Sequence, residues 1–167
     1  MQKISSFVAK VSFSLGCTLA AAHAYSQSTQ STCRFSSVTG IAFGLYDDTS
    51  STPRDTTANI VVNCTRNGGP PNVNVTLALG PSATSGSSST RSLRQGGGNS
   101  ITYNLYRDSS RGSIWGQTPG VDTVTQSLSI PNKSTATTTF TIFGRIGELQ
   151  SASVGTYGDS VVATVSY

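Results

Sequence analysis

The sequence predicts an all-β protein built as a β-sandwich. Several short segments alternate apolar and polar side chains, which is the period of a strand with one buried face. Clusters of Gly, Pro, Ser and Asn separate these segments at short spacing. No stretch has helical periodicity over a convincing length. About six or seven short strands joined by turns are typical of a sandwich.

Each segment is expected to be a strand for the same reason. Residues 73–79 give the clearest pattern, with Val or Leu at every odd position. Residues 80–99 are expected to be a loop, because Ser and Gly dominate and Leu93 is the only apolar anchor. The expected strands are residues 41–45, 58–65, 73–79, 100–108, 121–130, 135–146 and 161–167.

The last of these strands raises the main functional question. Val161, Ala163, Val165 and Tyr167 would share one face, and no partner strand follows them in the sequence. A Val-rich strand needs a backbone neighbour on both edges, or it leaves one edge exposed. The functional question is therefore which segment or protein supplies a strand to pair with the second edge of residues 161–167.

The N-terminus resembles a secretory signal. Lys3 and Lys10 precede or enter an apolar run over residues 11–22, which ends in the small-residue site Ala22-His23-Ala24. The run is too short to span a membrane as a mature helix. We expect cleavage after Ala24. The chain then divides into a signal peptide (1–24), a short polar arm (25–32) and a β-domain (33–167).

Cleavage lowers the positive charge and with it the case for a nucleic-acid partner. Loss of Lys3 and Lys10 takes Lys and Arg from 11 to 9 against seven acidic residues, so the net charge falls from +4 to +2. The remaining arginines are scattered along the chain rather than gathered in one stretch. A nucleic-acid interface is not expected, because it would need a basic patch.

The two cysteines that remain after cleavage are Cys33 and Cys64. An even pair in an exported protein predicts a disulfide, because that compartment is oxidising. In the chain-entropy model such a bridge is worth roughly 3–4 kcal/mol.

The residues needed for catalysis are missing from the mature sequence. It has no histidine, one glutamate (Glu148), no Gly-x-Ser-x-Gly motif and no cluster with metal-ligand spacing. We expect neither an enzyme nor a bound cofactor or metal. The aromatic residues Trp115, Tyr103, Tyr106 and Tyr46 could form a sugar-binding platform, although aromatics in a small sandwich are more often core. Trp115 is the candidate for a surface ligand contact.

Two motifs resemble a known family. Tyr103-Asn104-Leu105-Tyr106-Arg107-Asp108, followed by Ser109-Ser110-Arg111, resembles the middle motif of the spore coat protein U domain family. That family includes the pilins of archaic chaperone–usher pili. Residues 155–167 resemble its terminal strand, and Cys33 and Cys64 sit where it places its disulfide. The similarity spans residues 33–167.

The resemblance implies an immunoglobulin-like sandwich that is incomplete because it lacks the last strand, G. A periplasmic chaperone would fill the resulting groove, and the N-terminal extension of a neighbouring subunit would later replace it, which is donor-strand complementation. An outer-membrane usher would export the fibre from the periplasm to the cell surface, where it could meet a host or abiotic surface. The residues implied to line or border the acceptor groove are Val161, Ala163, Val165 and Tyr167.

One feature departs from a rod-forming pilin. Residues 25–32 contain one aromatic and no aliphatic side chain, whereas a donor strand needs alternating apolar residues. The sequence therefore predicts an acceptor-only subunit at a pilus tip or terminus. The alternatives are a stand-alone secreted or surface-coat β-sandwich and, third, a carbohydrate-binding module.

Overall fold

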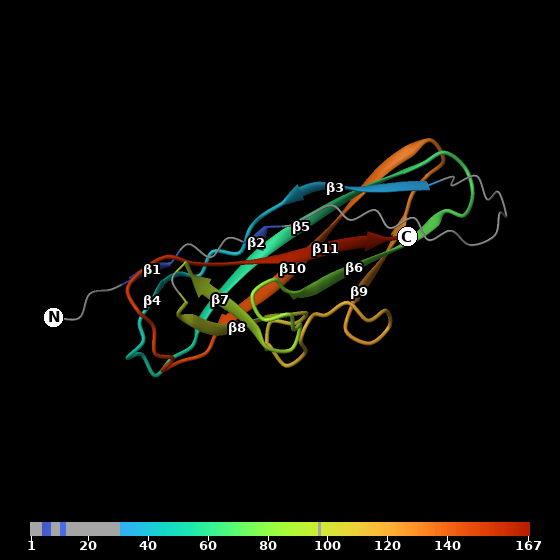
Figure 1. Ribbon diagram of the computed structural model, residues 1–167. Coiled ribbons are helices and arrows are strands. Elements are labelled where there is room, and N and C mark those ends of the chain that lie inside the picture. The colour runs from blue at the N-terminus through green and yellow to red at the C-terminus, as the bar shows by residue number, and fades with distance from the viewer. Residues whose placement is uncertain (1–4, 8–10, 13–30, 97) are drawn as a thin grey trace.

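The computed structural model describes residues 5–7, 11–12, 31–96 and 98–167. Every regular element within them is a strand (Figure 1), so the all-β prediction is confirmed. The strands are β1 (Ser5–Phe7), β2 (Val11–Ser12), β3 (Ser31–Val38), β4 (Gly44–Tyr46), β5 (Arg54–Arg66), β6 (Asn72–Ser82), β7 (Arg91–Gln95), β8 (Ser100–Tyr106), β9 (Val124–Ser129), β10 (Ser134–Ile146) and β11 (Tyr157–Ser166).

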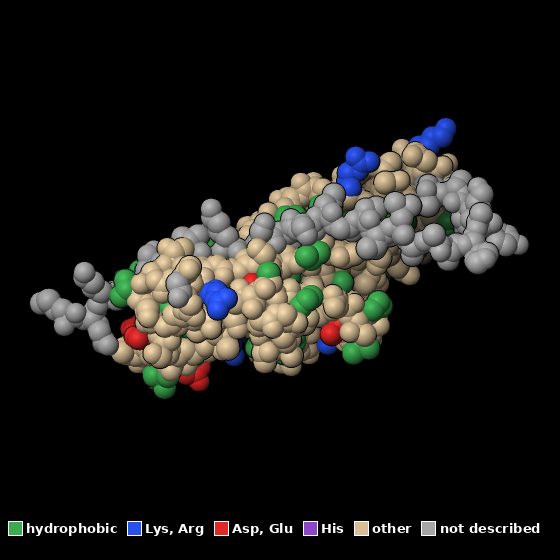
Figure 2. All heavy atoms as spheres, viewed as in Figure 1, with side chains coloured by type: hydrophobic (Ala, Val, Ile, Leu, Met, Phe, Trp, Pro, Cys, Tyr) green, Lys and Arg blue, Asp and Glu red, His purple; other side chains and the backbone are tan. Residues whose placement is uncertain are grey.

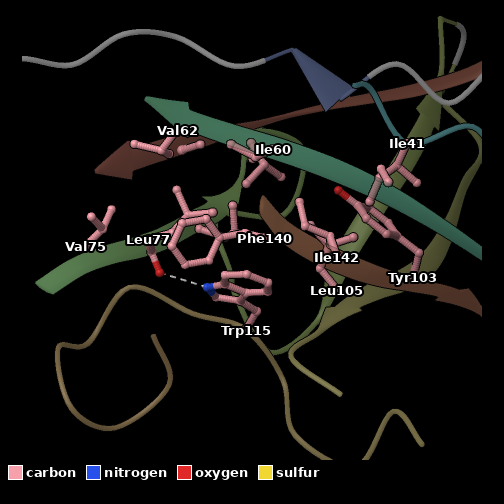
Figure 3. Packing of buried hydrophobic residues seen from close by; sticks show 14 of the residues in the cluster. Ile41, Ile60, Val62, Val75, Leu77, Tyr103, Leu105, Trp115, Phe140 and Ile142 are labelled. Atoms are coloured by element: carbon pink, nitrogen blue, oxygen red, sulfur yellow. Dashed lines mark hydrogen bonds between the residues drawn. The ribbon is translucent and has the colours of Figure 1, made fainter. Parts of the chain in front are cut away.

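The strands form one hydrogen-bonded path in the order β3-β5-β10-β8-β7-β11-β6-β9. All neighbours along this path are antiparallel. The path folds over, so that β6 lies across the core from β5 and β10 (Figure 3). This arrangement is an immunoglobulin-like β-sandwich.

The core follows the alternation of the strands. In β6 the four odd-numbered apolar side chains from residue 73 to residue 79 are all buried. They meet Ile60 and Val62 of β5 and Phe140 and Ile142 of β10, which are also buried (Figure 3). Removing this apolar surface from water is the main force that holds the two layers together.

A disulfide joins the first two strands of the path. Cys33 and Cys64 are directly opposite each other in β3 and β5, and their sulfur atoms are 2.05 Å apart. The predicted disulfide is confirmed.

Several predicted boundaries were wrong. Ser31 and Thr32, assigned to the polar arm, pair with Arg66 and Thr65 as the start of β3. The predicted loop over residues 80–99 contains β7, which pairs with β8. β7 was missed because Leu93 is the only apolar residue on its buried face, and Ser31 and Thr32 were missed because both are polar and only their pairing with β5 shows the strand.

The N-terminal predictions fall mostly outside the described residues. The structure describes only Ser5–Phe7 and Val11–Ser12 of the predicted signal peptide, and only the last two residues of the predicted arm. β1 pairs with β4, and β2 pairs with β11.

Candidate functional site: the edge of strand β11

The inward face of β11 belongs to the core. Val161 and Ala163 are each 1% exposed, and Val165 is partly buried against the same cluster. Tyr167 follows the last residue of the strand and is 53% exposed. Of the four residues predicted for the groove, two are therefore buried, one lies at the margin of the core, and Tyr167 lies in solvent beyond it.

From Val161 onward, β11 has one partner strand. It pairs antiparallel with β6 up to Ser166, after pairing with β7 through Tyr157 and Gly158. At Asp159 and Ser160 it also pairs in parallel with β2. A strand has two hydrogen-bonding edges, so one edge from Val161 to Ser166 has no strand partner among the described residues.

A second unpaired edge lies close to this one. β3 is the first strand of the path, and β5 is its only strand partner in the described ranges. Some Cα atoms of β3 and β11 lie within 8 Å of each other, and the two strands run along the same side of the molecule (Figure 1). No pairing joins β3 to β11 in the part of the chain that the structure describes.

A buried carboxylate anchors the other half of β11. Asp159 is 6% exposed, and it accepts hydrogen bonds from the Tyr103 hydroxyl at 2.7 Å and from the Thr84 backbone N–H at 3.1 Å. Burial, and next the bond to Asp159, raise the pKa of Tyr103, so this phenol stays neutral and donates. These bonds fix the start of β11 against β8 and the loop after β6.

Comparison with known proteins now identifies the family. Residues 18–164 match the Spore Coat Protein U domain. The chain belongs to the Spore Coat Protein U domain family. No curated protein matches it closely enough to count as a relative.

Membership in this family gives the general role. Spore Coat Protein U domains are structural pilus or coat proteins, associated with the cell surface or the extracellular space, and are not known as enzymes. Of the residues described for this domain, no group of three or more His, Cys, Asp or Glu side chains could hold a metal ion. The described part of the chain also contains no helix that is long and apolar enough to cross a membrane.

A buried arginine connects the strands next to β11 by hydrogen bonds in this Spore Coat Protein U domain. Arg91 is 0% exposed and donates to the side chain of Asn104 at 2.7 Å. Burial lowers its pKa, and its Nε has no hydrogen-bond partner among the described residues. Its other acceptors are the carbonyl oxygens of Leu79, Gly80, Trp115 and Ser88.

The prediction of a surface ligand contact at Trp115 was wrong. Trp115 is 1% exposed, and its indole N–H donates to the Leu77 carbonyl at 3.0 Å (Figure 3). Its ring lies 6.2 Å from that of Phe140. Its backbone N–H also donates to the Leu105 carbonyl at 2.8 Å, which attaches this residue to β8 while its side chain lies in the core.

Sequence reasoning missed both Asp159 and Arg91. Asp159 carried a signal, since it shares the odd-numbered face of Val161 and Ala163, and a carboxylate on an apolar face needs a buried partner. Arg91 shares a face with Leu93 in the same way. The scattered surface arginines were anticipated, and Figure 2 shows Lys and Arg spread over the visible face.

Proposed function

We propose that this Spore Coat Protein U domain is a subunit of an extracellular pilus, assembled by a periplasmic chaperone and an outer-membrane usher through donor-strand complementation. The observation that carries the proposal is the edge of β11, where Val161 and Ala163 belong to the core but the backbone has one strand partner among the described residues. An edge of this kind is a template for strand addition.

An added strand would hydrogen-bond to the free edge of β11, on the side where β3 lies nearby. Its inward side chains would cover Phe35 and Val165. Both residues are only partly buried against the core. Burial of apolar surface is worth about 25 cal/mol per Å², so such a strand would add substantially to the stability of the domain.

The pairing with β2 supports the same site. Val11 and Ser12 lie beside Asp159 and Ser160 in a parallel register. β11 thus pairs with a further strand immediately before Val161, next to the edge that we propose as the acceptor site.

The polar arm supports an acceptor-only role at a tip or terminus. Ser31 and Thr32 already pair with β5, which leaves residues 25–30 as the part of the arm before β3. These residues are Tyr-Ser-Gln-Ser-Thr-Gln and contain no aliphatic side chain to fill a neighbour's groove. The subunit would pass through the periplasm and remain at the cell surface with its neighbouring subunits.

The experiment compares the mature protein expressed with and without its chaperone. We expect a soluble chaperone complex and an unstable or aggregating isolated subunit. Val165→Asp should abolish chaperone capture, because it places a charge at the margin of the groove. Val162→Asp is the matched control, since Val162 is 41% exposed on the opposite face of the same strand and capture should persist.

A closed, soluble monomer without any partner would overturn the proposal and favour the stand-alone coat protein. A synthetic peptide with alternating apolar residues gives an independent measurement. It should raise the Tm of the subunit, whereas a peptide of the same composition in scrambled order should not.

A further inference from the structure

A second site lies away from the edge of β11, on the outer face of β8. An open pocket of about 300 Å³ is bordered by Thr90, Thr102, Asn104, Tyr106, Arg145 and Gly147. This volume is at the lower end of the range for small-molecule sites, about 300–1,000 Å³. Even-numbered residues of β8 form one side of the pocket, while Ile101 and Leu105 face the core.

Hydrogen bonds fix Asn104 and Thr102, which form the floor of the pocket. Asn104 is 6% exposed, donates to the Ser89 carbonyl at 2.6 Å and accepts from Arg91 at 2.7 Å. Gln150 bonds to the backbone N–H, the hydroxyl and the carbonyl of Thr102. A preorganised floor lowers the entropy that a ligand must overcome on binding.

Three polar groups at the pocket have no hydrogen bond to any described residue. They are the hydroxyls of Thr90 and Tyr106 and the Nη1 of Arg145, which uses Nε and Nη2 on Asp55. Hydroxyls donate and accept, whereas the guanidinium only donates. The Tyr106 ring adds apolar surface next to its polar end. This combination suits a ligand that carries several hydroxyl groups on a compact apolar frame.

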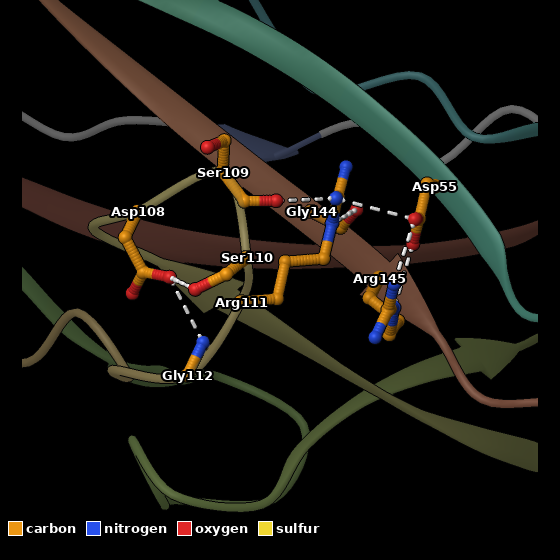
Figure 4. A network of polar contacts seen from close by, with 8 residues as sticks. All are labelled: Asp55, Asp108, Ser109, Ser110, Arg111, Gly112, Gly144 and Arg145. Atoms are coloured by element: carbon orange, nitrogen blue, oxygen red, sulfur yellow. Dashed lines mark hydrogen bonds and ion pairs between the residues drawn. The ribbon is translucent and has the colours of Figure 1, made fainter.

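The exposed charges around the pocket nearly balance, which disfavours a strongly anionic ligand. Asp55 binds Arg145 at 2.7 and 2.8 Å and Arg111 at 3.2 Å (Figure 4). Glu148, next in the chain to Gly147, adds a second negative charge that acts on Arg145. Two carboxylates therefore offset the guanidinium groups of Arg111 and Arg145, while the buried Arg91 is used on Asn104 and backbone carbonyls. We infer that the pocket binds a neutral sugar residue of a glycan.

The test uses the exported, oxidised protein with any partner that co-purifies. Isotope-labelled protein is titrated with glucose, galactose, mannose and N-acetylglucosamine, and with galacturonate and inorganic phosphate as anionic probes. We expect at least one neutral sugar to shift the amide signals of residues 102–106 and 145–147 and to leave those of residues 161–166 unchanged. Stronger shifts with galacturonate or phosphate, or no shift at tens of millimolar of any neutral sugar, would overturn the inference.

Two variants remove single hydroxyls without changing the fold. Tyr106→Phe and Thr90→Val should each weaken binding of the responding sugar by about three- to tenfold, the effect of one hydrogen bond. Tyr167→Phe and Thr137→Val are matched controls, because both residues are exposed and lie outside the pocket. Equal weakening by the controls, or unchanged affinity in both pocket variants, would also overturn it.

Discussion

The centre of the sandwich and its β11 side are built from similar alternating sequences but differ in how their strands are paired. β10 pairs with β5 along its whole length, from Ser134 to Ile146, and with β8 on its other edge. β11 pairs with β6 alone over its second half among the described residues. Both strands alternate buried and less buried positions, with Phe140 and Ile142 in the core from β10, and Val161 and Ala163 from β11.

The difference shows that alternation and pairing are separate properties of a strand. Alternation determines which face is buried, and both strands satisfy it. Pairing on the second edge depends on whether another strand is available. The central region should therefore respond to core mutations whether or not a partner is present, whereas the β11 region should respond to the partner.

The largest effect is expected at the centre, from Trp115→Ala. Loss of this side chain leaves a cavity beside Phe140 and an unpaired Leu77 carbonyl, which should lower the free energy of unfolding by roughly 3–5 kcal/mol. Trp115→Phe keeps most of the side-chain volume and should lower the free energy of unfolding by less. Urea denaturation of the donor-bound subunit gives the measurement, and a loss below about 1 kcal/mol would contradict the core placement.

The disulfide joins β5 in the centre of the sandwich to β3, which lies close to β11. Its removal should therefore affect both regions. Replacing Cys33 and Cys64 together with serine should lower the free energy of unfolding by roughly 3–4 kcal/mol. Because Cys33 holds β3, the same variant should bind a donor peptide more weakly than the oxidised protein. Calorimetry with and without peptide separates the two effects. Unchanged peptide affinity would show that β3 is not a wall of the acceptor site.

The sequence was sufficient for the strands that alternate strictly and for the disulfide. Residues 73–79 were predicted as a strand because their periodicity is local. Trp115 was misplaced because it lies between β8 and β9, outside any strand, where no alternation indicates which way its side chain points. Arg91 shares a face with Leu93, but the carbonyl groups that accept its hydrogen bonds come from three separate segments, so the sequence did not show where its partners lie.

A moderate effect is expected where β11 is anchored. Tyr103→Phe removes the donor to the buried Asp159 carboxylate and leaves that oxygen without its phenol partner. The free energy of unfolding should fall by about 1–3 kcal/mol. Tyr106→Phe on the outer face of the same strand is the control and should change stability little. Equal unfolding midpoints for wild type and Tyr103→Phe would show that the anchor adds nothing.

The smallest effect is expected in a surface turn that belongs to neither region. Asp108 accepts hydrogen bonds from the Ser110 hydroxyl and from the backbone N–H groups of Gly112 and Ser113 (Figure 4 shows the first two). The bond from Ser110, followed by that from Gly112, lowers the pKa of Asp108 to about 2. The folded pKa lies below the unfolded value of about 3.9.

The direction of the pH effect follows from this difference. The contribution of Asp108 to stability is present above about pH 4 and is lost as the pH falls through about 2, because the protonated carboxyl is a poorer acceptor. NMR titration between these values should show the Gly112 and Ser113 amides shifting together. The amides of residues 161–166 should not follow them, because none of the groups that hold that edge is bonded to Asp108. If the two sets moved with one midpoint, the turn and the edge of β11 would be coupled, and the turn would not be independent of the β11 region.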